Sequence, residues 1–210
     1  MKNVFYFAIM LLCVLSSCTS KTEVASPNSN IKWSLILDDK GAMTYQVTVN
    51  NQPFILPSAL GFEEKSGLNL KDGFQVVNTT FDSQDETWTQ PWGENKSIRS
   101  YYNEMAVNLK NGEGVKLTVR VRVFDDGLGF RYEYDTPADS LLLMDEYTSF
   151  NIAEDGTSWS IPAEFNTYEL LYRTMPLSEM PDANTPMTFK TQSGIYASIH
   201  EAALTDFPEM

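Results

Sequence analysis

The chain has 210 residues, of which 42% are hydrophobic and 12% aromatic, and this is enough apolar material for one sizeable core. Its formal net charge of −13 at pH 7 and its pI of about 4.4 argue against nucleic acid as a partner, because no basic patch is available to neutralise phosphates. The acidity has no further diagnostic value, since it also serves solubility.

The first 18 residues have the pattern of an export signal. Lys2 supplies the positive start, and an unbroken apolar run at 4–15 is too short for a transmembrane helix. The sequence LSSC at 15–18 resembles a bacterial lipobox, which predicts lipidation of Cys18. We therefore expect an exported, periplasmic lipoprotein anchored to the outer membrane by its acyl chains, with ordinary secretion as the alternative.

The two cysteines, Cys13 and Cys18, both lie in this N-terminal segment. The exported domain therefore contains no disulfide and depends on its core for stability. Residues 19–30 are small and polar, which predicts a flexible tether. The remainder, 31–210, is interpreted as a single domain.

Alternation of apolar and polar residues with period two, typical of strands, dominates the chain after this tether. The predicted strands cover residues 31–37, 43–49, 52–56, 74–81, 147–152, 157–161, 187–191 and 195–199. The third is expected to end at Pro57. The clearest hairpin spans 115–134, where alternate valines and leucines face one side and Asp125-Asp126-Gly127 forms the turn. Several antiparallel strands with Gly, Asp and Asn turns predict an all-β sandwich.

Residues 164–186 contain three prolines and several aromatics, and they are predicted to form a long ordered loop that includes Tyr168, Tyr172 and Arg173. Loops of this length in compact domains are often functional.

No complete catalytic site is recognisable. A Ser-His-Asp triad would need His200, the only histidine, and no serine lies in a nucleophile-elbow pattern. One histidine and no cysteine in the exported domain also argue against a zinc site, and phosphate-binding glycine loops are absent. Aspartates and glutamates are abundant, but their spacing does not select a catalytic pair.

The stretch TQPWGENKSIRSYYNE at 89–104 combines aromatic side chains with polar ones that carry several hydrogen-bonding atoms. This mixture suits a hydroxyl-rich ligand such as a sugar, with Trp92, Glu94, Arg99 and Asn103 as candidate contacts. The alternative is a loop between strands, in which the aromatics belong to the core and the charges are solvated.

Glu201 follows the predicted strand at 195–199, where a side chain at a strand end can project into a site. Its carboxylate is a suitable calcium ligand, although calcium takes about six to eight oxygen ligands and the others would come from elsewhere. The alternative is an ordinary surface glutamate.

Four collinear blocks resemble the N-terminal domain of glycoside hydrolase family 97. They are WSLILDDKGAMTYQVTVNNQPFI, QPWGENKSIRSYYNEMAV, VRVFDDGLGFRYEY and YASIHEAALTDFPEM. The resemblance implies an antiparallel β-super-sandwich of the galactose-mutarotase-like type. It also implies an exported, exo-acting bacterial α-glucosidase or α-galactosidase whose catalytic residues lie in a (β/α)8 barrel of the same polypeptide, beyond Met210.

In that family the glutamate of the HEAA block helps to bind an active-site calcium, a role that falls here on Glu201. The sandwich is expected to be incomplete at its C-terminal end, and the chain to be inactive without the barrel. The implied substrate is an α-linked oligosaccharide. The competing hypothesis is a non-catalytic carbohydrate-binding lipoprotein that uses the sandwich alone.

Overall fold

The computed structural model describes residues 21–135, 140–164 and 166–205, so the predicted signal segment and Cys18 lie outside the described residues. Within these ranges the secondary structure consists of antiparallel strands and one short 3₁₀ turn, η1 (Leu177–Glu179). No helix in this part of the chain is long and apolar enough to cross a membrane.

The described strands form four antiparallel sheets. The first contains β1 (Glu23–Ala25), β2 (Ile31–Leu37), β3 (Met43–Val49) and β4 (Gln52–Ala59), in that order. The second has the order β10 (Leu128–Asp135), β9 (Lys116–Phe124), β8 (Ser97–Asn111) and β7 (Phe74–Thr89). A small sheet joins β11 (Leu143–Glu146), β5 (Phe62–Glu64) and β6 (Asn69–Leu70). The fourth has the order β13 (Arg173–Pro176), β12 (Gly156–Ser160), β14 (Met187–Thr191) and β15 (Tyr196–Ile199).

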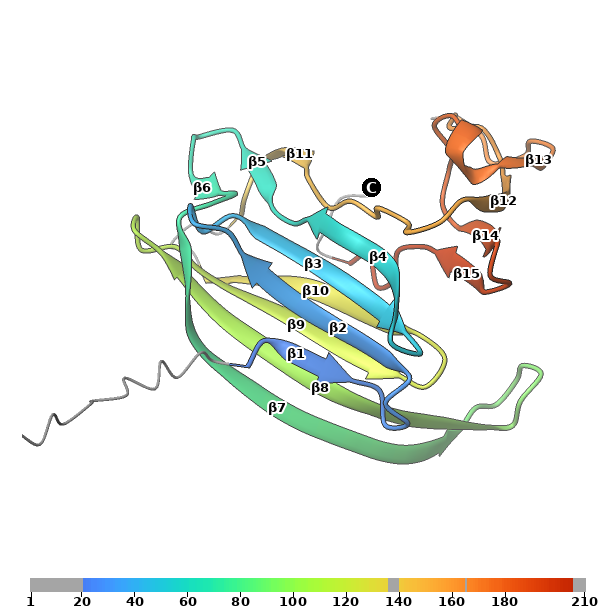
Figure 1. The fold of residues 1–210 in the computed structure, drawn as a ribbon, viewed down its shortest axis with the longest axis horizontal. Helices are drawn as coiled ribbons and strands as arrows, with labels where there is room; N and C mark the ends of the chain where they lie inside the picture. The colour runs from blue at the N-terminus through green and yellow to red at the C-terminus, as the bar shows by residue number, and fades with distance from the viewer. Residues whose placement is uncertain (1–20, 136–139, 165, 206–210) are drawn as a thin grey trace, which may run out of the picture.

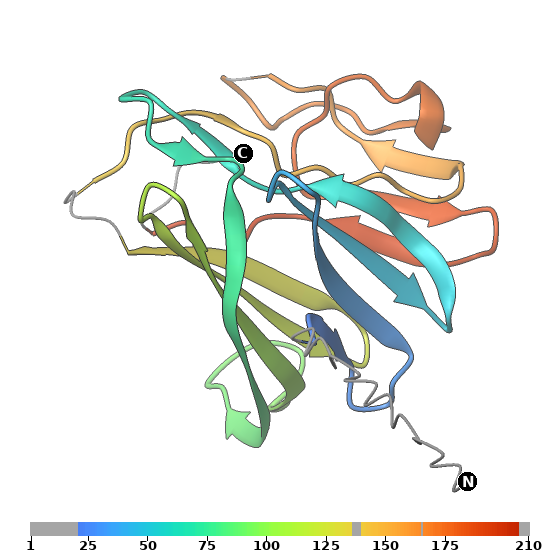
Figure 2. The ribbon, with the colours of Figure 1, turned by 60° about the vertical axis from the view of Figure 1, so that its left-hand side comes forward.

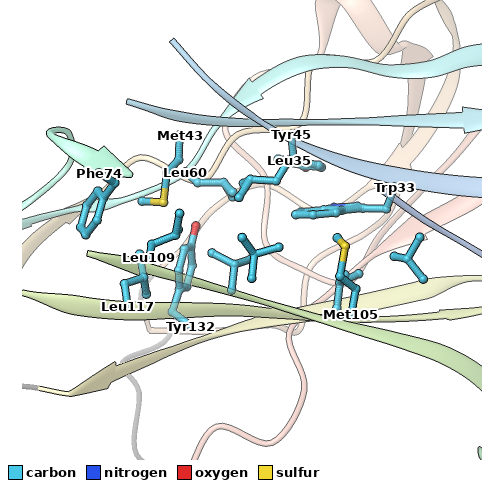
Figure 3. Close-up of a cluster of buried hydrophobic side chains, with 14 of the residues drawn as sticks. Trp33, Leu35, Met43, Tyr45, Leu60, Phe74, Met105, Leu109, Leu117 and Tyr132 are labelled. Atoms are coloured by element: carbon cyan, nitrogen blue, oxygen red, sulfur yellow. The ribbon is translucent and has the colours of Figure 1, made fainter. Parts of the chain in front are cut away.

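The first two sheets pack face to face and enclose the core (Figures 1 and 2). Strict alternation along β9 directs its apolar residues inward, and the same holds for β3. Figure 3 shows Trp33, Tyr45 and Met43 of the first sheet above Met105, Leu109 and Leu117 of the second. This packing is that of a β-sandwich, as the sequence predicted.

The fourth sheet lies beside β4, at the end of the sandwich away from β5 and β6 (Figure 1). The ring of Phe54 on β4 stacks on that of Phe189 on β14, with centres 6.1 Å apart. The connecting segment also follows β4, because the Leu56 amide donates to the Asn151 carbonyl and the Ala153 amide to the Phe54 carbonyl. These contacts attach the fourth sheet to the main core.

Most of the predicted strands are confirmed. β2 and β3 match the expected bounds, and β9, β10, β12, β14 and β15 differ from them by one residue at most.

Five expectations about local structure are corrected. Part of the expected tether is folded, because β1 pairs with β2 and buries Val24. β4 continues through Pro57, whose ring is compatible with an edge strand. A strand forms at Leu143–Glu146 rather than at 147–152, and the expected loop 164–186 contains β13 and η1.

The largest correction concerns 74–111. β7 runs to Thr89, and half of the stretch 89–104, residues 97–104, belongs to β8, while residues 90–96 form the turn between the two strands. The two strands form one long hairpin whose outer half extends beyond the sandwich (Figure 1). Because that half is solvated on both faces, it lacks the apolar alternation that reveals a strand in sequence.

The close approach of β12 to β14 depends on Gly156. A Cβ atom at this position would lie 2.0 Å from the Lys190 carbonyl oxygen, so any larger residue would force the two backbones apart. We expect Gly156→Ala to lower the free energy of unfolding by about 1–3 kcal/mol, the usual cost of overpacking. Urea denaturation would measure this loss. Gly129→Ala on β10 is the matched control, because a Cβ there meets nothing within 4 Å. Equal stability of the two variants would contradict the prediction.

Candidate functional site

Trp92 and Glu94 lie in the turn at the tip of the β7–β8 hairpin. The turn is closed by a hydrogen bond from the Gln90 amide to the Lys96 carbonyl, and by one from the Gln90 side chain to the Asn95 carbonyl at 2.7 Å. Trp92 is 82% exposed, so its indole belongs to no core. An exposed indole beside a solvated carboxylate is available to a ligand.

Arg99 and Asn103 lie on β8 and already have protein partners. The Arg99 guanidinium donates two hydrogen bonds to Asp85 on β7, at 2.7 and 2.8 Å, and lies 4.4 Å from the centre of the Tyr101 ring. The Asn103 side chain donates to the Ala25 carbonyl at 2.9 Å and so ties β1 to β8. Both residues therefore brace the hairpin.

The structure does not bring the four candidate sugar contacts into one cluster. At about 3.3 Å per strand residue, Arg99 and Asn103 are about 13 Å apart, and the turn with Trp92 lies beyond the start of β8. Trp92 and Glu94 therefore lie apart from the other two candidates, both exposed in the terminal turn.

A network of charged side chains spans three neighbouring strands of the second sheet, β8, β9 and β10. Glu104, only 9% exposed, accepts hydrogen bonds from Arg120 at 2.5 Å and from Arg122 at 2.7 Å. Arg120 also donates to Glu133 at 2.7 and 3.0 Å, and Glu133 accepts from Arg131. The carboxylates and guanidiniums thus alternate across the face of the sheet opposite the core.

These contacts shift the pKa values of three groups in the network, Glu133, Glu104 and Arg120. Hydrogen bonds from Arg120 outweigh burial and lower the pKa of Glu133 to about 2, and Arg131 adds to the effect. Burial alone would raise the pKa of Glu104, but its bonds to Arg122 and Arg120 reverse the direction. The pKa of Arg120 is raised by Glu133 first and by Glu104 next. All these groups stay ionised at neutral pH, so the network is structural rather than a source of protons.

An open groove of about 900 Å³ lies where the connection after β11 meets η1 and the fourth sheet. Its lining combines aliphatic side chains, Met180, Met187 and Ile199 among them, with the carboxylates of Asp155 and Asp182. Asp155 is held in place by the amide and hydroxyl of Ser178, at 2.9 and 2.8 Å, and these bonds lower its pKa. The mixed lining resembles that of ligand pockets.

Glu201 follows β15 and is partly exposed, two residues after Ile199 of the groove. The ring Nδ1 of the neighbouring His200 lies 2.9 Å from the Glu201 carbonyl oxygen. Within residues 21–135, 140–164 and 166–205, no three His, Cys, Asp or Glu side chains gather in a geometry that could hold a metal.

The sequence analysis did not identify the groove residues Asp155, Ser178 and Asp182. The signal that pointed toward them was the length of the segment 164–186, which supplies one wall of the groove. The participation of Asp155 could not be foreseen, because it depends on how η1 docks against the start of β12.

Three comparisons place this chain among known proteins. The family model described as glycosyl-hydrolase 97 N-terminal matches residues 24–210. A glycoside hydrolase family 97 enzyme from Pseudoalteromonas sp. strain K8, solved in complex with panose and also with acarbose, is 36% identical with a TM-score of 0.83. A probable retaining α-galactosidase from Streptomyces bingchenggensis is 27% identical over 167 residues.

The chain spans only part of these proteins. The alignment with the Pseudoalteromonas enzyme includes 90% of this chain but only 29% of that enzyme. The alignment with the α-galactosidase includes 79% of this chain and 26% of that protein. A β-arabinopyranosidase with a TM-score of 0.75 and 20% identity shares the fold.

The ion-pair network predicts sensitivity to acid. The folded pKa of Glu133 is depressed, so its stabilisation is fully present above the unfolded value near 4.5 and is lost as the pH falls toward 2. Because the Glu133 side chain is partly exposed, we expect it to stabilise the folded state by about 1 kcal/mol at neutral pH, which is less than the pKa shift alone implies. Urea unfolding between pH 7 and pH 2.5 should therefore show a shallower loss of stability for Glu133→Gln than for the unmodified chain. Parallel curves would contradict the prediction, and Glu113→Gln, at a glutamate outside the network, serves as control.

Proposed function

The chain belongs to the glycosyl-hydrolase 97 N-terminal family, and we propose that it is the N-terminal domain of a calcium-dependent, exo-acting α-glycosidase for α-linked glucosides or galactosides. The observation that carries this proposal is the family match over 24–210. The relatives support the substrate class, since one is an α-galactosidase and another was solved with panose and acarbose.

Glycoside hydrolysis generally uses two carboxylates at a defined separation. In this proposal they are supplied by a (β/α)8 barrel in the same polypeptide, and the present domain packs on that barrel and walls one side of the substrate pocket. The groove beside η1 supports this role, because its mixed polar and aliphatic lining lies next to the segment that carries Glu201.

Glu201 would supply one calcium ligand. Its carboxylate is a hard oxygen donor, is partly exposed and lies in an irregular segment after a strand, so the residue fits a site completed by another part of the protein. When bound, calcium would shape the electrostatics at the reacting sugar. Glu201 would orient that ion relative to the wall formed by this domain.

Trp92 and Glu94 are the sugar contacts that the exposed hairpin tip favours. Arg99 and Asn103 would act indirectly, since the ion pair with Asp85 and the bond to Ala25 fix the direction in which the hairpin projects. The alternative of a non-catalytic carbohydrate-binding lipoprotein would use the same tip without hydrolysis.

Calcium titration of the complete polypeptide tests the proposed enzyme. The unmodified protein should hydrolyse nitrophenyl α-glucoside or α-galactoside, and Glu201→Gln should weaken calcium binding and lower activity by about tenfold or more, with partial recovery in excess calcium. Glu94→Gln is the control, because it also replaces one exposed carboxylate but should leave the calcium dependence unchanged. Absence of hydrolysis would favour the binding lipoprotein. An unchanged calcium dependence in Glu201→Gln would return this residue to an ordinary surface position.

We also propose that Cys18 carries the lipid anchor, which would place the enzyme on the outer membrane facing the periplasm. Mass spectrometry of the N-terminal peptide should find acyl chains on Cys18, and the protein should partition into detergent. Cys18→Ser should remove both properties, whereas Cys13→Ser should change neither. A soluble mature protein that begins with an unmodified residue would refute the anchor.

A further inference from the structure

Two aromatic side chains lie side by side on the outer face of the fourth sheet. The rings of Trp159 on β12 and Tyr196 on β15 are parallel to within 10°, and their centres are 6.2 Å apart. This distance exceeds the roughly 3.5–4.0 Å of direct stacking contact between carbon atoms, so the rings are offset. Tyr196 is 65% exposed. Trp159 is partly exposed, so the aromatic surface open to solvent comes mainly from Tyr196.

The strand register shows that this face is distinct from the core. Thr188 on β14 pairs with Trp159 on one side and Ser198 on the other, and Lys190 pairs with Tyr196, so all these side chains share one face. Phe189 projects from the opposite face and stacks on Phe54. Met187 and Ile199, which line the groove, share the face of Phe189. The aromatic pair is thus separated from the groove by the thickness of the sheet.

Polar groups suited to hydroxyl recognition surround the two rings. The Lys190 ammonium lies over the Tyr196 ring, 5.0 Å from its centre, in a cation–π contact, and it can donate up to three hydrogen bonds. Thr188 and Ser198 lie in the same cross-strand row as Trp159, and the Thr188 hydroxyl donates to the Ser198 hydroxyl at 3.4 Å. Flat rings with hydroxyl and ammonium donors around them match a pyranose, which has an apolar face and a polar edge.

We propose that Trp159, Tyr196 and Lys190 form a non-catalytic binding subsite for an α-linked glucan chain on the outer face of the fourth sheet. Two offset rings suit consecutive sugar units better than a single sugar. The ligand is uncharged, which is compatible with a protein of net charge −13. The choice of an α-glucan rests on the proposed function and on the relative that was solved with panose; the aromatic platform itself does not depend on them.

Adsorption to granular starch tests the subsite. The 210-residue chain, with its fold checked by circular dichroism, should bind the granules, and Tyr196→Ala should raise the dissociation constant by about tenfold, as should Trp159→Ala. Tyr196→Phe keeps the ring and should stay within about twofold of the unmodified chain. Trp88→Ala is the matched control, because this tryptophan is 50% exposed on β7, away from the fourth sheet. Cellulose powder serves as the β-linked comparison.

If the isolated chain does not fold, the same substitutions can be tested in the complete enzyme. Adsorption at ice temperature should again depend on both rings, while hydrolysis of nitrophenyl α-glycosides should stay unchanged. Hydrolysis without ring-dependent adsorption would refute the subsite and leave the proposed enzyme intact. Ring-dependent adsorption without hydrolysis would support the subsite and refute the enzyme. If Tyr196→Ala instead changed only the oligomeric state, the platform would be an interface between copies and the subsite would be refuted.

Discussion

The packing of Trp33 and Tyr45 between the two main sheets is the interaction on which the rest of the domain depends. Both side chains are fully buried, and the centres of their rings are 5.8 Å apart. The ring centre of Phe130 on β10 lies 5.2 Å from that of Tyr45. The Tyr45 hydroxyl donates to the Ser149 carbonyl at 2.8 Å, so the same residue that joins the sheets also positions the segment that leads to the fourth sheet. Among the described residues, the buried Trp33 indole nitrogen has no hydrogen-bond partner, an energetic cost that the aromatic packing must exceed.

The sequence correctly predicted the strands that have one buried face and one solvent-exposed face. β2, β3 and β9 follow this rule, because their apolar residues alternate over seven residues or more and all of them contribute to the same core. The rule fails for the outer half of the β7–β8 hairpin. There, hydrogen bonds between the strands and the Arg99–Asp85 ion pair maintain the strands without any buried face. For that reason the expectation of a loop was wrong for residues 97–104, whereas residues 90–96 do form a turn.

The candidate functional residues also divide into those that the sequence could indicate and those that it could not. Trp92 and Glu201 could be selected from the sequence because they belong to motifs that resemble a known family. The groove could not, because Asp155, Asp182 and Ile199 come together only when η1 docks beside the fourth sheet. Pairing of Trp159 with Tyr196 is equally invisible in the sequence, since the two residues are 37 positions apart and are related only through β14.

The fourth sheet connects these features physically. One face of β14 and β15 attaches to the core through Phe189 and supplies Met187 and Ile199 to the groove, whereas the other face carries the aromatic platform. β15 then leads directly to Glu201. In the proposed function, this short hairpin, fixed by Phe54, leads to the candidate calcium ligand Glu201, lines the groove, and still exposes a separate surface to the proposed glucan chain. Because the two sites lie on opposite faces of the same strands, occupation of the platform need not obstruct the groove. This geometry is compatible with an enzyme that holds a polymer at one point while it works on a chain end at another.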